Sequence, residues 1–214
     1  MSRARAERPS GLYAILPADL PTERMEAMAA AALAGGVRWL QLRDKKQGFR
    51  RACRRAKRLA ALCADHDARL IVNDSIAVAA EAGACGVHLG RDELPGWQEI
   101  DRAHEQGLIV GVTCRGNAQW AQAAAAGGAD YLSFGAIFPT HSKPEVPTIG
   151  IARLAKARRL FPDAVIVAIG GIDADNIVQI KQAGADAAAL ISGIFAAGSI
   201  TERARLLDTL WRAA

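Results

Sequence analysis

The sequence predicts a single-domain α/β protein with the fold of a (β/α)8 TIM barrel, because short apolar runs alternate with helical stretches along the 214 residues. The runs are almost wholly apolar, so both faces of the sheet are expected to be covered, as in parallel sheets. Eight such pairs in this length fit a barrel near the small end of its size range. An open, flavodoxin-like sheet shows the same alternation but seldom reaches eight units.

The expected strands follow one another in chain order, and each leads into a helical stretch. They cover residues 12–16, 39–42, 70–72, 87–89, 109–112, 131–134, 165–169 and 187–191. Helical spacing of apolar residues is clearest at residues 50–63 and 118–126. The first ten residues are basic and poor in apolar side chains, so we expect a flexible tail at 1–10 and the barrel domain at 11–214.

A short alanine–glycine turn recurs before every second expected strand. Glycine is the favoured residue where a helix ends in a left-handed turn. The recurrence before strands two, four, six and eight therefore supports a repeating barrel. The turns are Ala34-Gly35-Gly36, Ala82-Gly83-Ala84, Ala126-Gly127-Gly128 and Ala183-Gly184-Ala185.

Composition and charge indicate a soluble, cytoplasmic protein that binds neither nucleic acid nor membrane. No signal peptide or membrane-length apolar run is found, and the four cysteines form no metal or disulfide pattern. The net charge of +5 is concentrated in one helix without interleaved aromatic residues, which favours a solvated outer face over a nucleic-acid surface. That face is expected to hold Arg50, Arg51, Arg54, Arg55, Lys57 and Arg58.

Cationic side chains follow the second expected strand. Alternation along the strand directs Gln41 and Arg43 into the barrel, with Lys45 just beyond them. Two cations facing a cavity indicate an anionic ligand, since guanidinium groups match phosphate oxygens. The alternative is a structural salt bridge of these cations with Asp44 or Asp74.

Two carboxylates follow the third and fourth expected strands. Asp74 and Glu93 stand on neighbouring strand ends, where they could share a Mg²⁺ ion that also binds substrate phosphates. Asn73, beside Asp74, is a candidate substrate ligand. The alternative is that Asp74 caps the following helix, as the Asn-Asp-Ser sequence permits.

Hydroxyl groups and one lysine follow strands five and six. Thr113 ends strand five, where it could contact substrate or cap a helix. The long connection after strand six carries Thr140, Ser142 and Lys143, and a long loop in a compact barrel is usually functional. A lid without ligand contacts is the alternative. His88 lies within strand four and is expected to be a satisfied core residue rather than a catalyst.

The last two strands end in small residues. Gly170 and Gly171 follow strand seven, and Ile191 and Ser192 follow strand eight. Loops at this place in a barrel commonly bind phosphate through backbone N–H groups. This pattern predicts a phosphorylated ligand but does not identify it.

Taken together, these ordered motifs resemble the thiamine phosphate synthase family from about residue 11 to residue 195. Each motif alone is only moderately specific, whereas the ordered set is strong. They are Gln41-Leu42-Arg43-Asp44-Lys45, Asn73-Asp74, Gly86-Val87-His88-Leu89-Gly90, Gly135-Ala136-Ile137-Phe138-Pro139-Thr140 with Lys143, and Ala168-Ile169-Gly170-Gly171-Ile172.

The resemblance implies a magnesium-dependent alkyl or aryl transferase of thiamine biosynthesis. It would join 4-amino-2-methyl-5-hydroxymethylpyrimidine diphosphate to 4-methyl-5-(2-hydroxyethyl)thiazole phosphate, with or without a carboxylate on the thiazole. Diphosphate leaves first, and the thiazole nitrogen captures the pyrimidine cation. The oligomeric state stays open, a homo-oligomer included.

The resemblance also assigns the site residues. Arg43, Lys45 and Lys143 would be catalytic, and Asp74 and Glu93 would hold Mg²⁺. The pyrimidine diphosphate would contact Gln41, Arg43, Lys45, Asn73, Thr113 and Lys143. The thiazole phosphate would contact Thr140, Ser142, Gly171, Ile191 and Ser192.

The chain departs from the family pattern at several positions in or near the site. Glu93 replaces a usual aspartate and Arg91 a usual glutamine, and milder changes occur at Thr113, Ser142 and Leu16. The departures admit a thiazole tautomerase-like paralogue or a catalytically inert ligand-binding barrel. A phosphosugar isomerase or epimerase would need an acid–base pair in the cavity.

Overall fold

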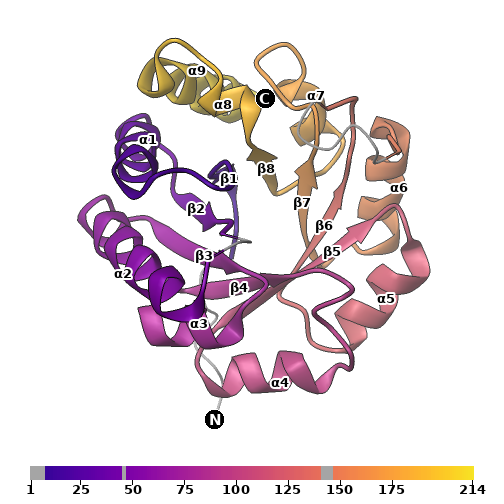
Figure 1. Ribbon diagram of the computed structural model, residues 1–214. Coiled ribbons are helices and arrows are strands. Elements are labelled where there is room, and N and C mark those ends of the chain that lie inside the picture. The colour runs from indigo at the N-terminus through magenta and orange to yellow at the C-terminus, as the bar shows by residue number, and fades with distance from the viewer. Residues whose placement is uncertain (1–7, 45–46, 141–146) are drawn as a thin grey trace.

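The computed structural model describes residues 8–44, 47–140 and 147–214, and its eight parallel strands close into a barrel in chain order. Helices surround this barrel on the outside (Figure 1). The strands are β1 (Gly11–Ile15), β2 (Trp39–Leu42), β3 (Arg69–Asn73), β4 (Gly86–Leu89), β5 (Ile109–Arg115), β6 (Tyr131–Gly135), β7 (Val165–Ile169) and β8 (Ala187–Leu190). The (β/α)8 prediction is confirmed.

Helices follow the strands as the alternation predicted, with one short additional helix, α8, between β8 and α9. They are α1 (Thr22–Ala34), α2 (Phe49–Asp65), α3 (Ile76–Ala82), α4 (Gln98–Glu105), α5 (Ala118–Ala126), α6 (Ile151–Leu160), α7 (Ile177–Gln182), α8 (Ser192–Phe195) and α9 (Ile200–Ala213). The largest boundary difference is in β5, which continues to Arg115, so Thr113 lies inside the strand. In the part of the chain described here, no helix has both the length and the apolarity to cross a membrane.

Two apolar layers hold the barrel together, one on each side of the sheet. Outward-facing residues such as Leu40, Val110 and Leu132 pack under the helices. Inward-facing residues fill the barrel, among them Tyr13 and Trp39. Because side chains alternate along a strand, every second residue of each strand faces the interior. Because the strands are parallel, their polar ends surround one opening.

The predicted alanine–glycine turns form as a structural repeat. One glycine in each turn has a positive φ, a conformation in which a side chain would be strained. The four angles are 104° at Gly36, 66° at Gly83, 93° at Gly128 and 95° at Gly184. Each turn therefore directs the chain from a helix into the next even-numbered strand.

Two of these repeats continue into an identical clasp at the amino ends of the strands. The Asp130 carboxylate accepts a hydrogen bond of 2.8 Å from the Val110 N–H, and the Asp130 N–H donates to the Val110 carbonyl. Asp186 makes the same pair of contacts with Ile166, at 2.7 Å for the carboxylate. This end of the barrel lies opposite the site, so the clasps contribute to stability.

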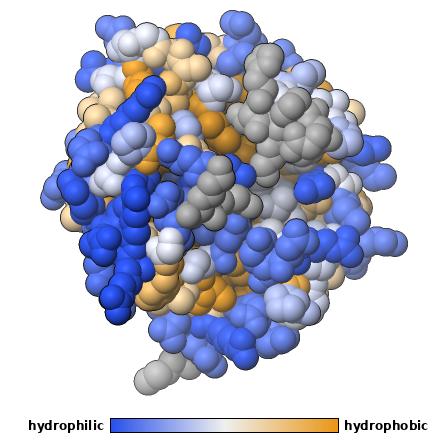
Figure 2. Space-filling view, viewed as in Figure 1, coloured by the Kyte–Doolittle hydropathy of each residue, from blue (hydrophilic) through white to orange (hydrophobic). Residues whose placement is uncertain are grey.

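The solvated-face prediction for α2 is wrong at Arg55. The Arg55 side chain is 3% exposed, and its Nε lies 2.8 Å from Asp44 Oδ2. Strongly hydrophilic side chains do gather over α2 in Figure 2, and Lys57 forms an exposed pair with Glu81. Of the predicted tail 1–10, residues 1–7 lie outside the described residues, while Arg8 pairs with Asp130 at 3.6 Å.

Candidate active site

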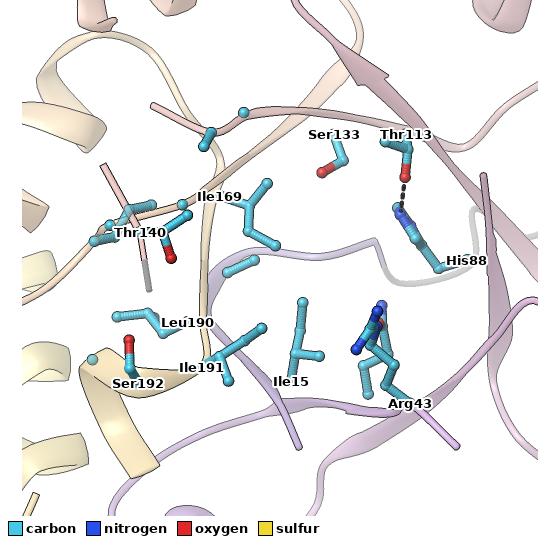
Figure 3. Close-up of a pocket in the computed structure, with 18 of the residues that line it drawn as sticks. Ile15, Arg43, His88, Thr113, Ser133, Thr140, Ile169, Leu190, Ile191 and Ser192 are labelled. Atoms are coloured by element: carbon cyan, nitrogen blue, oxygen red, sulfur yellow. Dashed lines mark hydrogen bonds between the residues drawn. The ribbon is translucent and has the colours of Figure 1, made fainter. Parts of the chain in front are cut away.

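A cavity of about 390 Å³ opens at the carboxyl ends of the strands. Polar side chains from β2 to β6 line one half of it, and apolar or glycine residues from β7, β8 and β1 line the other. Figure 3 shows this division, with Arg43, His88 and Thr113 on one side and Thr140, Leu190 and Ser192 on the other. The two halves have room for two ligands of different polarity.

Arg43 is the cation that extends β2 into the cavity, and a buried ion pair fixes the chain next to it. Its neighbour Asp44 turns away from the cavity to Arg55, and the Asp44 side chain is only 4% exposed. The pair meets at 2.8 Å without hydrogen-bond geometry, while a separate Arg55 N–H donates to Thr22 Oγ1 at 2.9 Å. Asp44 therefore pairs with a helix residue and leaves Arg43 facing the cavity.

Burial and the neighbouring Arg55 shift the pKa of Asp44 in opposite directions. Removal from water raises the pKa of the Asp44 carboxyl, and the nearby Arg55 guanidinium opposes this shift. A buried carboxylate beside a buried guanidinium stays charged only because the two compensate each other. The pair is thus an anchor between the β2 end and α2.

Gln41, Asn73 and Thr113 all line the polar half of the cavity, as the sequence predicted. The capping alternative fails for Thr113, because Asn117 caps α5 through the Trp120 N–H. Instead, Thr113 Oγ1 lies 2.8 Å from His88 Nε2. Thr113 is therefore held by a cavity residue rather than by a helix end.

The capping alternative also fails for Asp74. Ser75 is the N-cap of α3 and accepts a hydrogen bond of 3.2 Å from the Val78 N–H. Asp74 itself adopts a left-handed conformation, with φ of 68°, and its N–H donates to the His88 carbonyl across the β3–β4 pair. The carboxylate thus belongs to the loop at the opening of the barrel.

Asp74 and Glu93, the predicted magnesium ligands, follow the ends of β3 and β4 and are not among the residues that line the cavity. Glu93 folds back over the end of β4, where its Oε2 would lie 2.5 Å from a side-chain carbon added at Gly90. Asp74 follows the adjacent strand. Among the described residues, no group of three or more His, Cys, Asp or Glu side chains is placed to hold a metal ion, so a magnesium ion here would need further ligands from phosphate and water.

Close backbone approach shapes the other half of the cavity. The Ile137 and Phe138 N–H groups donate to the Ile169 and Gly170 carbonyls at 2.9 and 3.0 Å, which joins the loop after β6 to the end of β7. Gly171 is pressed against this loop and has φ of 65°, so a side chain would clash and be strained there.

The predicted thiazole-side residues that the structure describes lie in this half. Thr140, Gly171, Ile191 and Ser192 line the cavity. α8 begins at Ser192, and the first N–H groups of a helix have no partners within it. Those groups are suitable donors for a phosphate. The three other predicted residues, Lys45, Ser142 and Lys143, lie outside the described residues.

Two polar cavity residues were absent from the sequence-based assignment, and a third, His88, was expected to be a satisfied core residue. Ser133 on β6 and Arg115 at the end of β5 line the cavity. His88 also lines it, although both of its ring nitrogens have hydrogen-bond partners, as expected for a satisfied core residue. Strand alternation could have indicated that Ser133 and His88 face the cavity, because both stand at inward positions of apolar strands.

Arg91, which replaces a usual glutamine of the family, packs on an aromatic ring. Its guanidinium carbon lies 5.1 Å from the centre of the Trp120 ring. Trp120 in turn contacts Trp97, with ring centres 4.8 Å apart. The arginine that departs from the family pattern at this position therefore makes a cation–π contact with a residue of α5.

Comparisons with known proteins agree with the architecture and the motif order. A family model described as thiamine monophosphate synthase matches residues 12–194. The thiamine-phosphate synthase of Chromobacterium violaceum is 43% identical over 203 residues, covering 94% of this chain and 95% of that protein. That of Thioalkalivibrio sulfidiphilus is 41% identical over 207 residues, covering 96% and 97%.

A solved structure is similar along the same length. The thiamine phosphate pyrophosphorylase from Pyrococcus furiosus superposes with a TM-score of 0.84 and 30% sequence identity. The match covers 95% of this chain and 96% of that one. The likeness therefore extends over almost the whole chain.

Proposed function

The chain belongs to the thiamine monophosphate synthase family of transferases, and we propose that it joins the pyrimidine diphosphate to the thiazole phosphate to make thiamine phosphate. The two-sided cavity supports this proposal. One half offers fixed polar and cationic side chains, and the other offers apolar contacts and backbone N–H groups. A reaction between two phosphorylated rings needs both.

The pyrimidine diphosphate would occupy the polar half. Arg43 would bind the diphosphate through its planar guanidinium group, together with Lys45 and Lys143. Gln41, Asn73 and Thr113 would contact the pyrimidine ring. The position of Arg43 in the cavity, with Asp44 turned away to Arg55, supports this assignment.

Asp74 and Glu93 would hold a Mg²⁺ ion on the diphosphate. When bound, the ion would supply positive charge that stabilises the departing diphosphate. The position of the two carboxylates after the adjacent strands β3 and β4 supports this proposal.

The thiazole phosphate would occupy the opposite half. Its phosphate would lie at Gly171 and Ser192, with the hydroxyl groups of Thr140 and Ser142 as further donors. Ile191 and Ile169 would cover the thiazole ring and exclude water from it. This placement brings the thiazole nitrogen toward the pyrimidine methylene carbon.

The chemistry follows from the two bound ligands. The bond between the methylene carbon and the diphosphate oxygen breaks, and its electron pair leaves with the diphosphate. The lone pair of the thiazole nitrogen then forms the new C–N bond, which gives a thiazolium product. Fixed cations lower the barrier because the leaving group gains negative charge, and orientation of the two rings supplies a further part.

The experiment supplies the purified chain with both substrates, with and without magnesium. We expect thiamine phosphate and diphosphate in equal amounts, and a large loss of both in the presence of a chelator. Asp74→Asn should lower the rate by about 100-fold, since it removes a charge from the metal site. Product that forms equally well with a chelator would overturn the metal assignment, and no product at all would overturn the reaction.

A further inference from the structure

A continuous chain of hydrogen bonds crosses the barrel interior beneath the cavity. Gln41 Nε2 donates to Tyr13 Oη at 2.7 Å, and Tyr13 Oη lies 3.0 Å from Tyr131 Oη. Tyr131 Oη is 3.0 Å from His88 Nδ1, and His88 Nε2 is 2.8 Å from Thr113 Oγ1. The chain therefore links two predicted pyrimidine ligands, Gln41 on β2 and Thr113 on β5, through three other residues.

The direction of the first bond determines the direction of the rest. Because the Tyr13 oxygen accepts the Gln41 N–H, the Tyr13 hydroxyl hydrogen is directed to Tyr131. Tyr131 can in turn donate to His88 Nδ1, and an imidazole that accepts at Nδ1 carries its hydrogen on Nε2. That nitrogen donates to Thr113, whose own hydroxyl hydrogen is left for the cavity.

The two tyrosines at the centre of this chain are buried and keep their hydroxyl hydrogens. Tyr131 is completely buried and Tyr13 is 1% exposed. Burial raises the pKa of both phenols above their usual value, so each keeps the hydrogen that it donates. Gly111 makes room for the Tyr131 ring, because any side chain at position 111 would overlap it. A buried polar chain of this kind favours one consistent arrangement.

We propose that Tyr13, Tyr131 and His88 are positioning residues, which fix Thr113 as a hydrogen-bond donor and the Gln41 carbonyl oxygen as an acceptor in the cavity. The inference rests on the proposed function and deepens it, because it states how the ring is recognised. The complementary ligand has a ring nitrogen that accepts a hydrogen bond, next to an amino group that donates one. A 4-aminopyrimidine has this edge, whereas a 4-pyrimidinone presents the reverse pattern.

Two probes that cannot react test the inference by their relative affinity. They are the monophosphates of 4-amino-2-methyl-5-hydroxymethylpyrimidine and of its 4-oxo counterpart, titrated calorimetrically into the protein. We expect the wild-type chain to bind the amino probe about 100-fold more tightly, because the oxo probe leaves buried donors and acceptors unpaired.

Tyr131→Phe breaks the chain at its centre and keeps the ring. His88 can then change its tautomer, so Thr113 can accept as well as donate, and we expect the preference to fall to about tenfold or less. Tyr13→Phe should have the same effect, and the double variant should lose little more, because one break already disconnects the two ends. A merely structural defect would weaken both probes equally and leave their ratio unchanged.

Thr201→Val is the matched control. It removes one hydrogen bond of 2.9 Å, from Thr201 Oγ1 to the Ala31 carbonyl, between α9 and α1 and away from the cavity. The control should keep the wild-type preference. A preference that persists in both tyrosine variants, with thiamine phosphate still formed by the wild type, would overturn the positioning role while the proposed reaction stands.

Discussion

Arg43 combines a fixed position with an exposed charge in the cavity. Asp44 is held by Arg55, so Arg43 has no competing carboxylate at its own strand end. Arg43→Gln should lower kcat/KM by about 100-fold, because the guanidinium stabilises charge that develops on the departing diphosphate. Steady-state kinetics with the pyrimidine diphosphate varied would measure this loss.

Arg205→Gln supplies the matched control for that substitution. Arg205 is exposed on α9, outside the cavity lining. The control should keep the wild-type kcat/KM. Equal kinetics for the two variants would exclude Arg43 from binding the diphosphate.

Two buried thiols give a prediction that depends on their pKa values. Burial raises the pKa of Cys63 and of Cys114 to about 12. At pH 8 only about one molecule in 10⁴ then carries the reactive thiolate at either position. Iodoacetamide followed by mass spectrometry should therefore leave both cysteines unlabelled in the folded protein and label both in guanidinium chloride. Rapid labelling of either in the folded protein would contradict the burial.

Residue placement could be predicted from the sequence where it depends on strand alternation. Gln41, Asn73 and Thr113 reached the cavity because their parity and their position at strand ends determine their direction. Ser133 could not be distinguished in the same way, since a single hydroxyl within an apolar strand is equally common in a satisfied core. The partners of the His88 ring, Tyr131 and Thr113, lie on two other strands, which no local pattern records.

At the scale of elements, the end of β2 and the helix α2 act as one unit through the Asp44–Arg55 pair. Both side chains are at least 96% buried, so removal of one leaves an uncompensated charge in the interior. Arg55→Met should lower the free energy of unfolding by about 3 kcal/mol. Urea denaturation followed by circular dichroism would measure it.

The same helix carries its own control. Lys57→Met removes a cation from an exposed pair with Glu81, where water screens the interaction. This variant should unfold at the wild-type urea concentration. If Arg55→Met also unfolds at the wild-type urea concentration, the buried pair does not anchor the end of β2 to α2.

Arg55 was assigned to the wrong face of α2 because composition was followed where helical spacing would have given the correct face. Arg55 lies three residues after Ala52 and four before Leu59, and both of these are buried, so its position on the inward face was readable from spacing. The density of neighbouring arginines suggested a uniformly solvated face instead. Its acceptor, Asp44, lies on another element and could not be identified from spacing alone.

For the whole molecule, the barrel was predictable because its evidence is repeated along the chain. Eight apolar runs and four alanine–glycine turns repeat along the chain. The structure closes the corresponding strands in chain order, and each turn contains a glycine with a positive φ. What repetition could not reveal is which turns carry extra contacts. Asp130 and Asp186 occupy equivalent places before β6 and β8, whereas Arg38 and Cys85 stand at the corresponding places before β2 and β4.

The clasps made by Asp130 and Asp186 should hold the barrel closed without affecting catalysis. Each carboxylate accepts a strand N–H, so Asp130→Ala or Asp186→Ala leaves a buried donor unpaired and should cost about 1–3 kcal/mol of unfolding free energy. The two clasps share no partner, and the losses should add in the double variant. Asp163→Ala, at an exposed position between α6 and β7, should change nothing. Because the amino ends of the strands face away from the cavity, kcat/KM should stay at the wild-type value below the melting temperature. A loss of kcat/KM in the folded single variants would mean that this end of the barrel controls the geometry of the site, and the separation of stability from function across the two ends would not hold.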